Sequence, residues 1–443
     1  MKSWGKRNVL PGLGIFIALA ALALTGGCGG QPSAGKGDAA NPKPEEHEPV
    51  TVRVGVKSTG YLSNEEFQRY FVEPVKKKFP WITPEWVTYS NSSLPQMVAI
   101  GDAPDIVITN NVNGMPQMEE LALAGSIEDL IKAHKLDVSR IETFALDALK
   151  VASQRDELVG IPYTRHFGAL YYNKDIFDKF AVGYPKDGMT WPQVTELARH
   201  VTRMEGGVQY RGLEPNVPER LASQLSLGFV DPKKKVATFN SDPWKKVLKQ
   251  LVDIYSIPGN TQITTKAQGS QLFVKDRTLA MLAEVNIIFE SGLDKATDLN
   301  WDIASFPVWP EAPGVGMSPD THVMVLSQTS KVKDDAFRVI ATVVSDEVQM
   351  DMSRRGRFSV LKDPKIKQAF GQDMAFMKGK NIQAVYKTEL AKPYEQTLYD
   401  TIAMSAIQKE LSNVVLKGKD LNSALRDAEE SVNKQIETAE SGK

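Results

Sequence analysis

The chain has 443 residues, enough for two to four domains and a large hydrophobic core. Hydrophobic residues make up 42%, charged residues 24%, and the net charge is −1, which excludes a disordered chain and a basic nucleic-acid-binding surface. One Cys and five His exclude a disulfide framework and a CxxC zinc site, so we expect neither a metal nor a cofactor.

The first residues have the pattern of an export signal. Lys2, Lys6 and Arg7 supply positive charge, residues 15–24 (IFIALAALAL) form an apolar run, and small residues lead to Cys28. The apolar run is shorter than the ~20 residues that a membrane-spanning helix needs. The alternative interpretation is a single-pass membrane anchor.

The segment LTGGC resembles a bacterial lipobox, in which cleavage precedes a diacylated cysteine. Thr25 stands where an aliphatic residue is usual, with Leu24 one place earlier. We predict a signal peptide over 1–27, lipidation of Cys28 and anchoring at the outer face of a bacterial cell membrane. The alternative is an ordinary secretory signal with an incidental cysteine. Residues 28–50 are small, polar and Pro-rich and predict a flexible tether.

The remaining chain alternates short β-like runs with amphipathic helices. Residues 52–56 (VRVGV) and 81–88 predict strands, and a helix is expected between them over 65–79. Residues 105–109 (DIVIT) read as a buried parallel strand, and 115–124 as a helix that closes at Gly125.

Two capping signals predict further helix starts. Ser126 and Asp129 have capping-box spacing, as do Thr190 and Gln193, the latter with Pro192 in the first turn. Strands alternating with helices predict an α/β fold with a mostly parallel sheet. The sequence contains no HExxH, GxSxG or Walker A motif, and spacing alone suggests no nucleophile–base pair.

Five blocks, taken in chain order, resemble segments of one family. They are GDAPDIVIT (101–109), GIPYTRHFGALYYNKDIFDKF with TWPQVTELARHVT (160–202), FVKDRTLAML (273–282), FPVWPEAPGVG through SKVKDDAFRVIATVVSDEVQ (306–349), and GKDLNSALRDAEESVNKQI (418–436). The family is that of the extracellular solute-binding proteins of bacterial ABC importers, the maltose-binding-protein-like group. The blocks span almost the whole chain after the expected signal.

The resemblance implies a two-lobe, type II periplasmic-binding-protein-like α/β fold with a ligand cleft between the lobes. Three hinge crossings are expected near residues 165–167, 309–314 and 362–367. Lobe one would comprise 51–166 plus 311–366, and lobe two 167–310 plus 367–443. Ligands of open α/β sheets bind beyond the carboxyl ends of strands, and a cleft between lobes can close by hinge motion.

The resemblance also implies a set of ligand-binding positions at strand ends and crossings. They are Ser58, Thr59, Tyr61, Asn110, Asn111, Asn113, Tyr163, Arg165, His166, Glu284, Asn286, Trp309 and Tyr394. Each could instead form a turn or pack the lobes. We expect Trp309 to be exposed in the cleft, and the Arg165 guanidinium either to bind hydroxyls or a carboxylate, or to form a structural salt bridge.

The resemblance implies an extracytoplasmic, non-enzymatic substrate-binding component of an ABC importer. Its expected partners are membrane permease subunits and their ATPase, and we expect a monomer. Maltodextrin-binding members often carry aromatic residues where this chain has Thr109 and 284–287. A small or charged oligosaccharide, or another polar solute, therefore fits.

Two other classes stay open at this point. A surface lyase or glycosidase could use Glu214 and Glu284 as a carboxylate pair. An adhesin or structural lipoprotein would not close on a small ligand.

Overall fold

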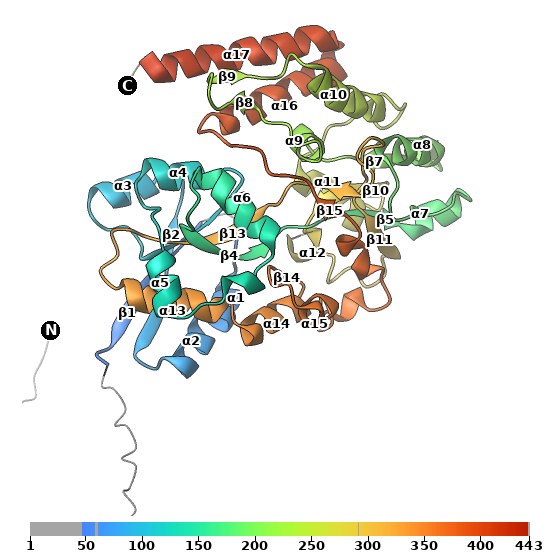
Figure 1. The fold of residues 1–443 in the computed structure, drawn as a ribbon. Helices are drawn as coiled ribbons and strands as arrows, with labels where there is room; N and C mark the ends of the chain where they lie inside the picture. Colours follow the sequence, from blue (N-terminus) through green and yellow to red (C-terminus); the bar gives the residue numbers. More distant parts are fainter. Residues whose placement is uncertain (1–46, 58–60, 291, 442–443) are drawn as a thin grey trace, which may run out of the picture. The chain divides into compact units, whose positions relative to one another are not determined.

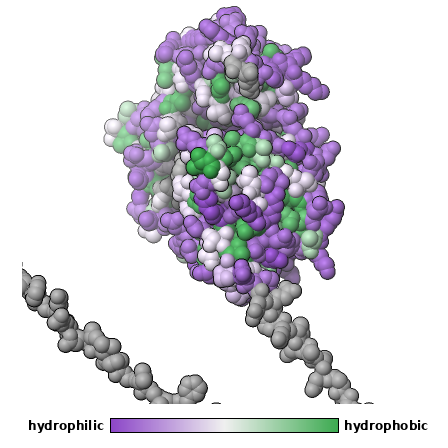
Figure 2. Space-filling view, turned by 90° about the vertical axis from the view of Figure 1, so that its left-hand side faces the viewer, coloured by the Kyte–Doolittle hydropathy of each residue, from purple (hydrophilic) through white to green (hydrophobic). Residues whose placement is uncertain are grey.

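The computed structural model describes residues 47–57, 61–290 and 292–441, and Glu48–Lys443 form one unit. The expected signal peptide, Cys28, most of the tether, Ser58 and Thr59 lie outside the described residues. Within the described ranges, no helix is both long and apolar enough to span a membrane. Figure 2 shows one face of the molecule, where small apolar patches are bordered by hydrophilic residues, an ordinary distribution for a protein surface.

The first sheet has six strands in the order β14-β4-β13-β3-β1-β2. Its strands are β1 (Val50–Lys57), β2 (Ile82–Tyr89), β3 (Ile106–Asn110), β4 (Gly160–Arg165), β13 (Thr321–Leu326) and β14 (Phe358–Ser359). The strands predicted over 52–56, 81–88 and 105–109 are thus confirmed. All five residues of β3 are buried, as expected for a continuous apolar run.

Helices flank this sheet (Figure 1). They are α1 (Asn64–Phe67), α2 (Glu73–Lys78), α3 (Leu94–Ala99), α4 (Met115–Glu120), α5 (Glu128–Ala133), α6 (Thr143–Ser153), α13 (Lys333–Val343), α14 (Asp346–Arg354) and α15 (Pro364–Gln368), with a short 3-10 turn η2 (Val138–Arg140). The helix predicted over 65–79 is interrupted, because a π-helical segment η1 (Gln68–Val72) separates α1 from α2.

Two predictions in this region are wrong in detail. Helix α4 ends at Glu120 rather than Ala124, and Ala122 then adopts a left-handed φ of 51° that stops helical hydrogen bonding. Ser126 and Asp129 do not form a capping box, because the N-cap of α5 is Ile127, whose side chain makes no capping bond.

The second sheet has five strands in the order β11-β5-β10-β7-β6. They are β5 (Gly168–Asn173), β6 (Arg203–Glu205), β7 (Val208–Glu214), β10 (Leu279–Val285) and β11 (Trp301–Ser305). Its helices are α7 (Lys174–Lys179), α8 (Trp191–Val201), α9 (Pro218–Ser223), α10 (Asp242–Tyr255), α11 (Lys266–Val274), α12 (Ile287–Glu290), α16 (Asp400–Lys417) and α17 (Leu421–Ser441). The capping box of α8 at Thr190 and Gln193 is confirmed. In Figure 1, α16 and α17 lie side by side and pack on α10.

The remaining described elements are short. They are the strand pairs β8 (Val230–Asp231) with β9 (Val236–Ala237) and β12 (Val315–Gly316) with β15 (Glu389–Leu390), and the 3-10 turns η3 (Ala375–Met377) and η4 (Ile382–Tyr386).

The expectation of mostly parallel sheets is wrong. In the first sheet only β1 pairs in parallel, with β2 and β3, and in the second sheet only β7 and β10 are parallel. The other pairs in both sheets are antiparallel. Strands β5 and β13 are entered by the chain passing from the other sheet, so the helical crossover that enforces parallel pairing is missing at these two strands.

The shortest passage between the sheets is at the end of β4. Only His166 and Phe167 separate Arg165, the last residue of β4, from Gly168, the first of β5. A Cβ on Gly168 would lie 2.7 Å from Met317 and 2.8 Å from Phe306, so a side chain does not fit there. The antiparallel pairing of β13 with β3 places His322 opposite Asn110, so the start of β13 lies beside the carboxyl end of β3.

Candidate ligand-binding site

Polar side chains gather where β1 and β3 end. Asn110, the last residue of β3, donates from Nδ2 to the Tyr61 hydroxyl at 2.6 Å. Its Oδ1 accepts from the backbone N–H groups of Asn113 and Gly114 at 2.9 and 3.1 Å. Asn110 therefore shapes the turn before α4 and also fixes the Tyr61 ring at the sheet edge.

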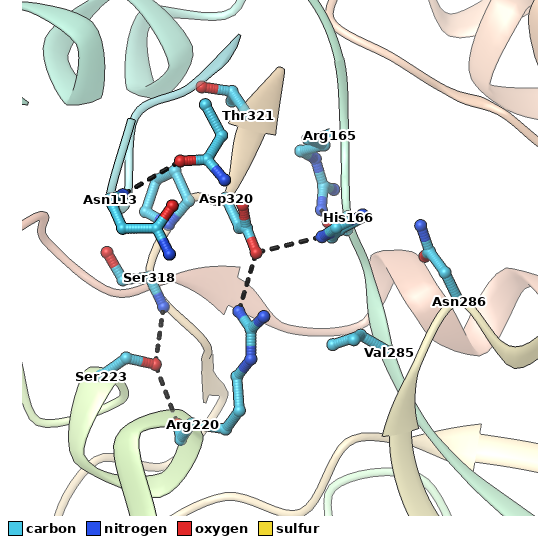
Figure 3. Close-up of polar contacts among 12 residues, drawn as sticks. Asn113, Arg165, His166, Arg220, Ser223, Val285, Asn286, Ser318, Asp320 and Thr321 are labelled. Carbon is cyan, nitrogen blue, oxygen red and sulfur yellow. Dashed lines mark hydrogen bonds and ion pairs between the residues drawn. The ribbon is translucent and has the colours of Figure 1, made fainter. Parts of the chain in front are cut away.

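Asp320 joins segments that lie far apart in the sequence (Figure 3). Its Oδ2 lies 3.0 Å from His166 Nδ1 and accepts a hydrogen bond from Arg220 Nη1 at 2.9 Å. Asp320 precedes β13 of the first sheet, whereas Arg220 lies on α9 beside the second. Burial alone would raise the pKa of Asp320, but the charges of His166 and Arg220 outweigh burial and hold that pKa well below its ordinary value.

His322 lies next to this ion-pair cluster and is fully buried. Its ring centroid is 4.4 Å from that of Tyr61 and 4.7 Å from that of His166, both edge to face. Burial lowers the pKa of His322 well below its ordinary value, so the ring is neutral. Neither ring nitrogen, nor the hydroxyl of buried Tyr163, has a hydrogen-bond partner among the described residues. Unpaired buried polar atoms of this kind are uncommon and mark a place where a partner fits.

The second sheet contributes a cavity of about 290 Å³ beside this cluster. Glu284 near the end of β10 lines it, and its Oε1 accepts from Asn216 Nδ2 and from the backbone N–H of Val285, both at 2.8 Å. Burial raises the pKa of Glu284. Asn216 and Asn286 follow the neighbouring strands β7 and β10 with left-handed φ values of 79° and 47°. Such strained backbone clusters at functional sites.

Glu214 lines the same cavity, but its carboxylate is already hydrogen-bonded to other side chains of the protein. It accepts from Arg211 Nη2 at 2.9 Å and from the Tyr255 hydroxyl at 2.5 Å, and it is 4% exposed. Burial raises the pKa of Glu214. This carboxylate is therefore already satisfied by internal donors.

A second cavity of about 670 Å³ has walls from elements of both sheets. Pro116 and Glu119 of α4 form one side, and segment 396–399 forms the other. The side chain of Gln154 at the end of α6 donates to the backbone carbonyl of Gln396 at 3.3 Å. Gln396 is 3% exposed and its Oε1 has no partner in the described part of the chain.

Other expected site residues have structural contacts. Asn111 Nδ2 donates to the Pro319 carbonyl at 2.9 Å and its Oδ1 accepts from the Thr321 N–H at 2.6 Å. Asn286 Oδ1 accepts from the Phe167 N–H at 3.1 Å.

Tyr394 does not line the Glu284 cavity. It packs beside Phe229, with ring centroids 5.7 Å apart, and lines a separate cavity. The contact with ligand expected for Tyr394 stays a prediction.

Trp309 differs from expectation, and Arg165 lacks the salt bridge that was one of its two expected roles. Trp309 is 1% exposed in the core of the second sheet and donates from Nε1 to the Leu221 carbonyl, so its expected exposure in the cleft is wrong. Arg165 forms no salt bridge among the described residues and stacks 3.5 Å above the Phe358 ring.

Sequence reasoning missed Asp320, Arg220, His322 and Asn216. Asp320 and His322 flank the start of β13, and their polar character just before an apolar run was the available signal. Nothing local to Arg220 on the short helix α9 indicated its partner. Within the described ranges, no group of three His, Cys, Asp or Glu side chains is arranged to hold a metal ion.

The sequence matches the family model of the bacterial extracellular solute-binding proteins over residues 63–350. The chain therefore belongs to that family. Solved structures with the same two-lobe fold include an ABC substrate-binding protein from Listeria monocytogenes in complex with cycloalternan. That protein is 18% identical, with a TM-score of 0.68 over 88% of this chain and 99% of its own.

Two further solved structures have the same fold at similar sequence identity. A sugar-binding protein from Xanthomonas citri is 16% identical, with a TM-score of 0.70 over 88% of this chain and 98% of its own. A solute-binding protein from Agrobacterium vitis with bound D-mannitol is 16% identical, with a TM-score of 0.61 over 88% of this chain and 99% of its own.

Proposed function

We propose that this protein captures a sugar or sugar alcohol outside the cytoplasm and delivers it, unchanged, to the permease subunits of an ABC importer. The observation that carries the proposal is the polar cluster of Asp320, His166, His322 and Arg220 between the two sheets of a solute-binding fold. Sugars present many hydroxyl groups, and buried charged and amide groups are the partners that bind hydroxyls strongly.

Each sheet with its helices would form one lobe, with the boundaries expected from the sequence: 51–166 plus 311–366, and 167–310 plus 367–443. Ligand would enter between Tyr61 and Asn113 on one side and Glu284 and Arg220 on the other. Closure of the lobes would then remove water and strengthen each hydrogen bond.

A binding screen tests this proposal. The purified protein is mixed with a library of sugars, sugar alcohols and other small solutes, and a rise in melting temperature identifies ligands. Calorimetry then compares wild type with Glu284→Gln and with the exposed control Glu347→Gln. Loss of one charged hydrogen bond is worth about 1.5–3 kcal/mol, so Glu284→Gln is expected to weaken binding roughly ten- to a hundredfold and Glu347→Gln not at all.

The enzyme alternative makes a different prediction for the same samples. A lyase or glycosidase would release new sugar ends on prolonged incubation, and a Glu214→Gln change would abolish that release. Recovery of intact ligand supports a binding protein, whereas new products would overturn the proposal.

Lipid anchoring is the last part of the proposal. Diacylated Cys28 would tether a monomer to the outer face of the membrane, where the permease subunits and their ATPase assemble. Cys28→Ser should abolish incorporation of labelled lipid in the producing cell. A mutant that still carries the lipid label would contradict the lipobox interpretation.

A further inference from the structure

A cavity of about 320 Å³ lies at the junction of β4, β14 and segment 386–390, and none of its lining residues lines the Glu284 cavity. Its walls include Arg165, Phe358, Tyr386, Lys367, Glu142 and Thr388. The binding site described under the proposed function does not use this cavity.

Arg165 is the unusual member of this cavity. Arg165 is 8% exposed. The only hydrogen bond of its side chain within the described residues runs from Nη1 to the His166 carbonyl at 3.0 Å. Its guanidinium carbon lies 3.5 Å from the ring centroid of Phe358 and 5.4 Å from that of Phe144. Nε has no partner, and no described carboxylate pairs with the guanidinium. Most of the five N–H donors of the Arg165 guanidinium therefore have no hydrogen-bond partner among the described residues.

The charge of Glu142 acts on the Arg165 guanidinium but does not neutralise it. Lys367 pairs with Glu142, so these two side chains satisfy each other. Glu389 also lines the cavity but its side chain is exposed. The Tyr386 hydroxyl has no partner among the described residues. Burial lowers the pKa of Arg165 to about 10, which still leaves it protonated at neutral pH. An uncompensated buried charge is costly unless an opposite charge joins it.

We propose that this cavity is a binding site for a small oxyanion, a carboxylate or a phosphate, held by the Arg165 fork and the Tyr386 hydroxyl. A guanidinium presents two parallel N–H donors that match two oxygens of such an anion, and stacking on Phe358 fixes the plane of the fork. The site is separate from the proposed sugar site, because the cavity lined by Arg165 and the cavity lined by His166 and Glu284 share no lining residue.

The test measures anion binding to the full protein by thermal shift and calorimetry. Sodium phosphate and sodium acetate are each compared with sodium chloride at equal ionic strength. We expect at least one of the two oxyanions to raise the melting temperature saturably beyond chloride. Arg165→Gln should weaken that binding at least tenfold, and Tyr386→Phe, which removes only the hydroxyl, about two- to tenfold.

Two control variants locate the site. Arg354→Gln, which removes a surface arginine paired with Asp373, should bind the anion as wild type does. Arg220→Gln, at the sugar site, should also retain it. Equal shifts with chloride, no shift with either oxyanion, unchanged affinity in Tyr386→Phe, or loss of binding in Arg220→Gln would each overturn the proposal. If Arg165→Gln does not fold, the Tyr386→Phe measurement alone decides it.

Discussion

Asp320 shows how one residue can connect two sheets. Its carboxylate is 5% exposed, and one oxygen, Oδ2, makes the polar contacts with both His166 and Arg220. The second oxygen has no hydrogen-bond partner in the described part of the chain. A carboxylate in this position is stable only because cationic groups compensate for burial. The same residue therefore holds the sheets together and leaves one acceptor free for a ligand.

We predict that Asp320→Asn lowers the free energy of unfolding by about 3 kcal/mol at pH 7, since Arg220 is left without its carboxylate. The folded-state pKa of Asp320 lies below its unfolded value, so its stabilisation is present above about pH 4 and is lost as pH falls further. Urea unfolding at pH 7, 5 and 3 should show the difference between wild type and Asp320→Asn shrinking at pH 3.

The matched control is Asp253→Asn, which removes a surface carboxylate paired with Lys249. Exposed pairs contribute about 0.2–1 kcal/mol, so this variant should remain near wild type. Equal loss of stability in both variants would contradict the role given to Asp320.

At the scale of elements, β7 and α8 pack closely because Gly212 has no side chain. A Cβ at Gly212 would overlap the backbone oxygen of Ala198 and the hydroxyl of Thr202, both within or just after α8. The helix therefore packs directly on β7, the strand whose last residue, Glu214, lines the Glu284 cavity. Close packing of this kind lets the strand end present its polar residues to the cavity.

We predict that Gly212→Ala lowers the free energy of unfolding by about 1–3 kcal/mol, because the helix must move away from the strand. The control is Gly183→Ala, where a Cβ would meet nothing within 4 Å. Denaturant unfolding should leave Gly183→Ala within about 0.5 kcal/mol of wild type. A Gly212→Ala protein as stable as wild type would mean that α8 and β7 tolerate a larger separation.

Asp400, in the first turn of α16, is a buried carboxylate whose ionisation lowers stability, whereas ionisation of Asp320 raises it. Burial raises the pKa of Asp400 to about 6, although its Oδ1 accepts a hydrogen bond from Thr397. Because the folded-state pKa exceeds the unfolded value, stability is full below about pH 4 and falls as pH rises through about 6. Asp400→Asn cannot ionise. We therefore expect it to exceed wild type by about 1–3 kcal/mol at pH 8 and to match it at pH 4, measured by urea unfolding.

If wild type is instead more stable than Asp400→Asn at pH 8, a neighbouring group in the fold stabilises the Asp400 carboxylate. Tyr394 is a candidate for that group, because its pKa is raised by burial and then by the charge of Asp400.

For the whole molecule, the two-lobe fold predicts a change of shape on ligand binding. A ligand found in the screen should bring the lobes together, since contacts to both sheets are made at once. Small-angle scattering should then show a smaller radius of gyration with that ligand and no change with a sugar that gives no thermal shift. An unchanged radius with a tightly bound ligand would contradict the hinge.

Much of the fold could be predicted from local patterns. The strands at 52–56, 81–88 and 105–109 and the capping box at Thr190 depend on residues within a few positions of one another. The end of α4 and the cap of α5 could not, because Ala122 and Ile127 take conformations that tertiary packing selects over the local preference.

The candidate site divides in the same way. Sequence placed Tyr61, Asn110, His166 and Glu284 at strand ends, because a strand's end is a local property. Asp320 and Arg220 are 100 positions apart, and only the passage of the chain between the sheets brings them to 2.9 Å. The direction of Arg165 and the burial of Trp309 were likewise decided by tertiary structure.

The sequence by itself therefore determined the family, through five blocks that resemble it in chain order. It also determined the α/β class and the strand ends, because these follow from short-range patterns of apolar and turn-forming residues. Only the tertiary structure decided the antiparallel pairing, the ion pair between the sheets and the separate Arg165 cavity. Contacts of that kind depend on distances between segments that no local pattern encodes, and burial then sets their charge states.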